Sequence, residues 1–157
     1  MNIKADLDVL FNELQQITVK KSSSTSTRSG FEIHRSMSFG LTRHRFKGRE
    51  LKPSYASTRY PHIHKLIYDV GNRYCTHPFT SVHLNHNVTC PPHIDADNVG
   101  ISTVLSFGNY TGGTLVVEGE IRDAYCNPVT FDGSRLMHWN TADLVGNKYS
   151  LVFYNKL

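Results

Sequence analysis

"GISTVLSFGNYTGGTLVVEG", residues 100–119, has β-branched residues towards both ends and turn-forming residues in the middle. Two short strands separated by a turn at "GNYTGG" are therefore expected. The same pattern extends to both sides of this stretch, in "FTSVHLNHN", "NPVTF", "SRLMHW" and "KYSLVFYN", with breaks at "TCPP", "FDGS" and "VGN". Short strands at this spacing are typical of a sandwich or a barrel.

The residues before position 79 predict helices. Apolar residues recur at helical spacing from Ile3 to Ile17, which indicates one amphipathic helix. A second helix is expected from Pro61, which suits a first helical turn, to Gly71, which would end it. The polar stretch "KKSSSTSTRSG" at 20–30 is expected to connect helix and core.

Length and composition are those of one globular domain. The 157 residues are 39% apolar and 19% charged, and no apolar run is long enough to cross a membrane. We expect one domain over 1–157 in the mainly β class with flanking helices (α+β). Residues 1–78 would supply helices and supporting strands, and residues 79–157 the β core.

The N-terminal stretch and the cysteines indicate an intracellular protein, cytoplasmic or nuclear. "MNIKADLDVLFNELQQI" is amphipathic and acidic where a signal peptide needs a basic start and an apolar block. Cys75, Cys90 and Cys126 are odd in number and widely spaced, so neither a disulfide framework nor a zinc ribbon is expected.

One histidine-carboxylate motif follows the strand-like "SVHLNHN". His93 and Asp95 stand in "PPHIDADNVG", and His138 follows 43 residues after Asp95, next to the strand-like "SRLM". Two imidazoles and one carboxylate on one face of a metal form the ligand set of ferrous oxygenases. We interpret these three residues as that set, with Asp97 in the turn; a metal set that uses His83 is a minor alternative.

Lys148 lies ten residues beyond His138, on the strand expected in "GNKYSLVFYN". It shares a face with Ser150 and Val152, so an ammonium and a hydroxyl could grip one carboxylate. A lysine that points into an apolar barrel without an anion would cost several kcal/mol. In the alternative arrangement Lys148 points outward and Tyr149 inward.

"HID", "GGTL", "FDGSRLMHW" and "GNKYSLVFYN" together resemble the iron(II)/2-oxoglutarate-dependent dioxygenases, whose core is a double-stranded β-helix, or jelly roll. The resemblance covers residues 79–155. It implies that His93, Asp95 and His138 bind Fe(II) as the catalytic centre. It also implies that Lys148 and Ser150 bind 2-oxoglutarate, with O2 as the second co-substrate. Many branches use arginine where this chain has Lys148.

Within that superfamily, "HLNHNVTCPPHIDADNVGISTVLSFGNYTGGTL" is most similar to small TET/JBP- and AlkB-type enzymes, which act on nucleic acids. Asn85 would then hydrogen-bond 2-oxoglutarate. A basic segment at 43–65 would hold a phosphate backbone. Residues expected to contact substrate are Asn98, Tyr110, Trp139, Arg43 and Arg45.

Three alternatives remain open at this stage. Gly112-Gly113 and Lys148 also occur in prolyl-hydroxylase-like proteins, so the substrate could be a peptide. The jelly roll could also be a non-enzymatic binding module with a relict metal site. A metal-dependent cupin enzyme that does not use 2-oxoglutarate is the third alternative.

Overall fold

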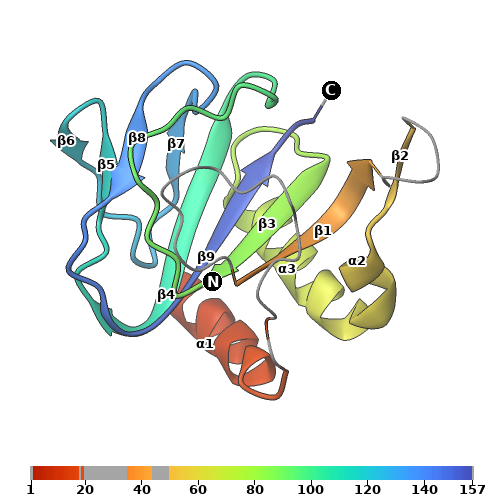
Figure 1. The fold of residues 1–157 in the computed structure, drawn as a ribbon. Helices are drawn as coiled ribbons and strands as arrows, with labels where there is room; N and C mark the ends of the chain where they lie inside the picture. Colours follow the sequence, from red (N-terminus) through yellow and green to blue (C-terminus); the bar gives the residue numbers. More distant parts are fainter. Residues whose placement is uncertain (1, 18, 20–34, 44–49, 157) are drawn as a thin grey trace.

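The computed structural model describes residues 2–17, 19, 35–43 and 50–156. Three helices and nine strands are assigned within these ranges (Figure 1). In chain order they are α1 (Ile3–Leu14), β1 (Ser36–Arg43), β2 (Leu51–Pro53), α2 (Tyr55–Arg59), α3 (Pro61–Tyr74), β3 (Ser81–His86), β4 (Ser102–Thr111), β5 (Leu115–Val117), β6 (Glu120–Ile121), β7 (Val129–Phe131), β8 (His138–Asn140) and β9 (Val145–Tyr154).

The strands form two sheets in which every paired neighbour is antiparallel. The large sheet has the order β2-β1-β3-β9-β4-β7, and the small sheet has the order β6-β5-β8. Figure 1 shows the helices gathered beside the large sheet, with the small sheet apart from them. The predicted class, a mainly β jelly-roll core with flanking helices, is confirmed.

The two faces of the large sheet have opposite characters. On β9, Tyr149, Leu151 and Phe153 are buried in the main hydrophobic core. That core includes Leu7, Leu10 and Leu14 of α1 and Ile63, Ile67 and Val70 of α3. The alternate residues Lys148, Ser150 and Val152 line a cavity on the other face, because successive side chains of a strand point to opposite sides. One strand therefore serves both the core and the cavity.

Two predicted strand boundaries are wrong. β4 does not end before "GNYTGG", because Asn109 and Tyr110 still pair with Asn147 and Gly146 of β9. "SRLM" is not a strand. Instead, Asp132 accepts hydrogen bonds from the amide and hydroxyl of Ser134, and the amide of Leu136 donates to the Asp132 carbonyl. This turn ends where β8 begins, at His138.

The predicted helices are present, with different ends. α1 starts at the predicted Ile3, capped by the Asn2 side chain, and ends at Leu14, before Ile17. α3 starts at Pro61 but continues past Gly71 to Tyr74. A Cβ on Gly71 would lie 2.4 Å from Cζ of Phe79 and 2.7 Å from Cε1 of Phe153. Gly71 therefore lets two aromatic rings approach the helix and does not end it.

Among the described residues, no helix is both long and apolar enough to cross a membrane. The connector predicted at 20–30 lies outside the described residues.

Candidate metal centre

His93, Asp95 and His138 converge at one point. Each offers one ligand atom, and these atoms all lie within 4.8 Å of one another. Nε2 of His138 lies 3.1 Å from Oδ2 of Asp95, and Nε2 of His93 lies 3.6 Å from Oδ1. Distances of this size leave room for one ion between the three side chains.

The backbone holds this trio in place. The amide of each of the two histidines donates to the carbonyl of the other, both at 3.0 Å, which joins His93 to the first residue of β8. The Asp95 amide donates to the Gly133 carbonyl at 2.8 Å. A Cβ on Gly133 would lie 3.3 Å from Cε1 of His138 and 3.4 Å from Oδ2 of Asp95. The absence of a side chain at Gly133 therefore leaves room for these two side chains to approach each other.

The hydrogen bonds of the two rings favour metal binding. Nδ1 of His93 lies 2.7 Å from the Pro91 carbonyl, and Nδ1 of His138 lies 2.9 Å from the Leu136 carbonyl. A carbonyl oxygen only accepts, so each Nδ1 carries a proton and each Nε2, directed toward Asp95, is the ring atom left to bind a metal. Two ring nitrogens and a carboxylate that converge in this way suit a shared cation, and the backbone carbonyls fix the orientation of both rings. The residues present therefore fit a divalent metal ion.

The trio lines a cavity of about 420 Å3 between the two sheets, here called the metal cavity. The large sheet contributes a polar floor made of Ser36, Ser38, His83, Asn85, Ser106 and Ser150. Five of the residues predicted to contact co-substrate or substrate line it, namely Asn85, Asn98, Trp139, Lys148 and Ser150. Trp139 follows His138 on β8 and is half-buried.

Lys148 points into the protein, so the alternative with an outward Lys148 is wrong. Its side chain is 4% exposed, and burial lowers its pKa from the usual value of 10.5. Nζ donates to the Gly113 carbonyl at 2.6 Å and lies 5.5 Å from the centre of the Tyr110 ring. Tyr149 is buried as well, on the helix side of the sheet.

Tyr110 lies in the predicted turn at "GNYTGG", but the structure places it on β4, where it is half-buried. Burial raises the pKa of its phenol to about 12. It does not line the metal cavity but a smaller cavity next to it, which it shares with Gly113 and Lys148. A contact of Tyr110 with the main substrate is therefore not supported.

In the part of the chain that the structure describes, the basic segment at 43–65 is spread over β1, β2, α2 and α3. Arg43, at the end of β1, is exposed and lines neither cavity. Lys65 is on α3, on the helix side of the sheet, and pairs with Asp69 at 2.9 Å. Arg45 lies outside the described residues.

Sequence reasoning did not assign Ser106 or Tyr154 to the cavity, although strand alternation could have placed both there. Ser106 lies opposite Ser150 in the β4–β9 pair, and Tyr154 follows Ser150 and Val152 on β9. His83 also lines the cavity, and its Nδ1 lies 3.3 Å from the Ser38 hydroxyl oxygen. It is not part of the three-residue cluster, so the metal set that uses His83 is not supported.

No family model matches the chain, and no curated protein matches it in sequence. Several solved structures match it in fold. NgTET1 in complex with 5mC DNA has a TM-score of 0.58 and 12% identity, over 98% of this chain and 67% of that one. A Pseudomonas putida prolyl-4-hydroxylase has a TM-score of 0.56 and 13% identity, over 99% and 86%. An oxidoreductase of the 2OG-Fe(II) oxygenase family from Burkholderia pseudomallei has a TM-score of 0.58 and 16% identity, over 96% and 76%.

The protein thus has the fold of the 2-oxoglutarate- and iron-dependent oxygenases, and the predicted resemblance is confirmed at that level. The fold does not choose among branches, since a DNA-bound structure and a prolyl-4-hydroxylase match it about equally well.

Proposed function

We propose that the protein is an Fe(II)- and 2-oxoglutarate-dependent dioxygenase that hydroxylates a substrate C–H bond. The observation that carries this proposal is the set of three ligand atoms within 4.8 Å of one another, with both Nδ1 atoms turned to backbone carbonyls. The shared fold supports the same conclusion. The intact set also argues against a relict binding module, because a decayed site should have lost a ligand.

Each group of residues has a distinct role in this proposal. His93, Asp95 and His138 would hold the iron at the wall of the metal cavity. Lys148 supplies positive charge at the far end of the 2-oxo acid, and Ser150 and Asn85 supply hydrogen bonds along it. Bound iron supplies the oxygen activation coupled to decarboxylation of 2-oxoglutarate to succinate, chemistry that the side chains cannot supply.

We further propose that the substrate is a modified nucleobase in DNA or RNA. The metal cavity has a half-buried Trp139 in its wall, and an aromatic side chain of this kind can stack on a base. Asn98, His83 and Ser38 place polar groups around the same space, as is needed to read the edge of a base. The base would have to be unpaired or flipped out of the duplex to reach the metal.

The reaction class is tested by anaerobic titration of the protein with Fe(II) and 2-oxoglutarate. A weak visible absorption band should appear when the keto acid chelates the iron, and His93→Ala and His138→Ala should each abolish it. His62→Ala, on the exposed face of α3, is the matched control and should leave the band unchanged. A band that survives His93→Ala would rule out the proposed ligand set.

The substrate is tested by succinate release from the active protein. Single-stranded oligonucleotides with methylated bases should stimulate release, and affinity should fall steeply with added salt. Proline-containing peptides serve as the comparison. Stimulation by peptides alone would replace the nucleobase proposal with a peptidyl hydroxylase.

A further inference from the structure

Ser102, the first residue of β4, carries a buried hydroxyl group that has no hydrogen-bond partner among the described residues. The residue is 3% exposed and lines the metal cavity. A buried hydroxyl group in this position costs free energy, because folding removes its water and returns no hydrogen bond. In the wall of a cavity that suits a ligand, such a group points to a ligand atom that completes its hydrogen bonding.

The polar neighbours of Ser102 on the cavity face of the large sheet already have partners. Continuing the antiparallel pairing of β4 with β9 by one residue places Ser102 beside Tyr154. The Tyr154 phenol forms a hydrogen bond with Ser81, whose own hydroxyl group donates to the Leu41 carbonyl at 2.6 Å. Ser81 therefore accepts from Tyr154, and the proton of each of these hydroxyl groups is committed to a partner other than Ser102.

Both strands beside Ser102 reach the three metal ligands. On β7, Phe131 pairs with Ser102, and the centre of its ring lies 5.0 Å from that of the His138 ring, edge to face. On β9, burial, first, and the charge of Asp95 raise the pKa of Tyr154, so this phenol lies within range of a metal ligand. Ser102 thus belongs to the part of the cavity wall that adjoins the metal centre.

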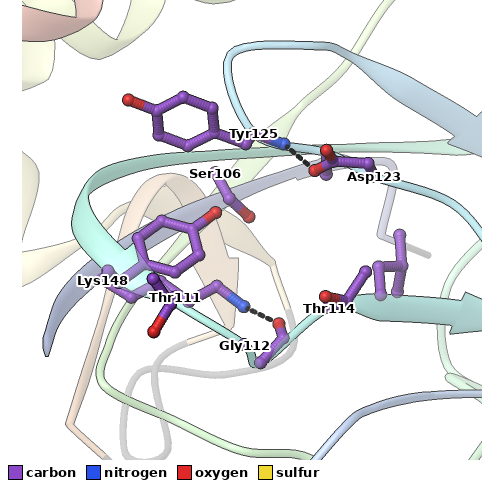
Figure 2. Close-up of a pocket in the computed structure, with 11 residues that line it drawn as sticks. Ser106, Thr111, Gly112, Thr114, Asp123, Tyr125 and Lys148 are labelled. Atoms are coloured by element: carbon purple, nitrogen blue, oxygen red, sulfur yellow. Dashed lines mark hydrogen bonds between the residues drawn. The ribbon is translucent and has the colours of Figure 1, made fainter. Parts of the chain in front are cut away.

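The groups that the proposed function assigns to 2-oxoglutarate lie at the other end of the metal cavity. Ser106 pairs with Ser150 and, like Lys148, lines both cavities. Figure 2 shows Ser106 and Lys148 among the residues of the smaller cavity, and the Ser106 side chain is hydrogen-bonded to Tyr110. Ser106 lies four residues beyond Ser102 on the same face of β4, which is about 13 Å of extended strand. Ser102 is therefore left for a different molecule, the substrate whose C–H bond is oxidised.

The loop that follows the metal motif brings further polar groups to the Ser102 end of the cavity. Asn98 forms a backbone bridge with Lys156, which lies two residues beyond Tyr154. Both residues of this bridge line the metal cavity, together with Asp97. A hydroxyl, an amide and an ammonium suit the polar edge of a base and its phosphate, and a carboxylate can accept from an exocyclic amino group. This end of the cavity thus has the groups that a nucleotide requires.

We propose that Ser102 determines substrate specificity by hydrogen-bonding an exocyclic amino or carbonyl group of the nucleobase. The inference rests on the proposed function, and it assigns Ser102 to the substrate and not to the 2-oxo acid. A hydroxyl group both donates and accepts, so either kind of exocyclic group completes its hydrogen bonding. An analogue of the base without that group is rejected, because the buried hydroxyl group then stays unpaired.

The first test measures stability in the absence of substrate. Because the hydroxyl group has no partner in the protein, Ser102→Ala should raise the midpoint of thermal unfolding by roughly 2–4 °C. Ser106→Ala, on the same face of β4, is the matched control and should lower the midpoint, since Ser106 is hydrogen-bonded to Tyr110. A midpoint that falls or does not change in Ser102→Ala overturns the inference.

The second test measures succinate release at saturating 2-oxoglutarate with a single-stranded oligonucleotide that carries one methylated base. Ser102→Thr keeps the hydroxyl group, and Ser102→Val has nearly the same shape without it. Ser102→Val should therefore show a kcat/KM for the oligonucleotide about tenfold or more below that of Ser102→Thr. The affinity for 2-oxoglutarate, from the visible band, should differ by less than about twofold between the two variants.

A base analogue without its exocyclic amino or carbonyl group completes the cycle. It should lower kcat/KM by the same factor in Ser102→Thr and cause no further loss in Ser102→Val, because both changes remove one hydrogen bond. If the Thr and Val variants behave alike, or if Ser102→Val weakens 2-oxoglutarate as much as the oligonucleotide, the inference is overturned and the reaction class stands. If only proline-containing peptides stimulate succinate release, the inference falls with the nucleobase proposal. If 2-oxoglutarate produces no band with the wild type, the reaction class itself fails.

Discussion

Gly71 either only interrupts α3 or makes room for packing against it, and these two explanations predict opposite changes in stability when Gly71 is replaced by alanine. A glycine that only interrupts a helix costs about 1 kcal/mol relative to alanine, so Gly71→Ala would then stabilise the protein. In the structure, however, the new methyl group would lie 2.4 Å from a ring carbon of Phe79 and 2.7 Å from one of Phe153. Phe153 is 1% exposed and has little room to move.

Overpacking of a core costs about 1–3 kcal/mol. Because two rings are involved, we take the upper end and subtract the gain in helix propensity, which leaves a loss of about 2 kcal/mol. For a domain of this size that is a fall in unfolding midpoint of roughly 4–8 °C. Circular dichroism during thermal and urea unfolding measures both quantities.

Asn72→Ala, the exposed neighbour on α3, is the control and should raise the midpoint slightly through helix propensity alone. Phe79→Leu removes the nearest ring carbon, so the cost of Gly71→Ala should shrink in that background. If Gly71→Ala raises the midpoint as Asn72→Ala does, the packing described for α3 is incorrect.

Two further predictions concern pH. Burial lowers the pKa of Lys148 from 10.5, so between the lowered value and 10.5 the unfolded chain binds more protons and stability rises with pH. Lys148→Met lacks this rise, so the wild type should gain stability relative to the variant as pH increases through that window. Urea unfolding at several pH values measures this difference, and parallel curves of unfolding free energy against pH would refute burial of the ammonium. A hydrogen bond from Tyr74, first, and the charge of Arg73 lower the pKa of Asp6 from 3.8, so its contribution is present above 3.8 and is lost as pH falls through the lowered value. Asp6→Asn should therefore be less stable than the wild type at neutral pH and converge with it in acid, as followed by circular dichroism; a difference that stays constant down to pH 2 would contradict this.

The metal trio and the inward Lys148 could be predicted from the sequence because both depend on short-range rules. His-x-Asp fixes two ligands within three residues, and alternation along one strand sets which face Lys148 shares. The partner histidine was found because a late histidine beside a strand-like run completes a known ligand set. The six-stranded and three-stranded sheets that bring these parts together were predicted only as a class.

The incorrect predictions concern residues whose role depends on distant partners. Glycine is a residue type that commonly ends helices. Only the rings of Phe79 and Phe153 show that Gly71 is needed for close packing inside α3. "GNYT" has the composition of a turn, but pairing with β9 keeps it extended. Tyr110 follows from that second error, since a residue on a paired strand is half-buried beside Lys148 and not exposed at a loop tip.

The division of β9 into two sets of residues has a consequence for how this protein can change. Odd-numbered positions 149, 151 and 153 contribute to the core, and even-numbered positions 148, 150 and 152 to the cavity. Substitutions at even positions can therefore alter ligand preference while the hydrophobic contacts that set stability remain. A shift of the strand by one residue would instead place Tyr149 and Leu151 in the cavity and Lys148 against the helices, so folding and ligand binding would be lost together. Selection can thus change the ligand preference of β9 one side chain at a time, whereas it cannot change the register of β9 in this way.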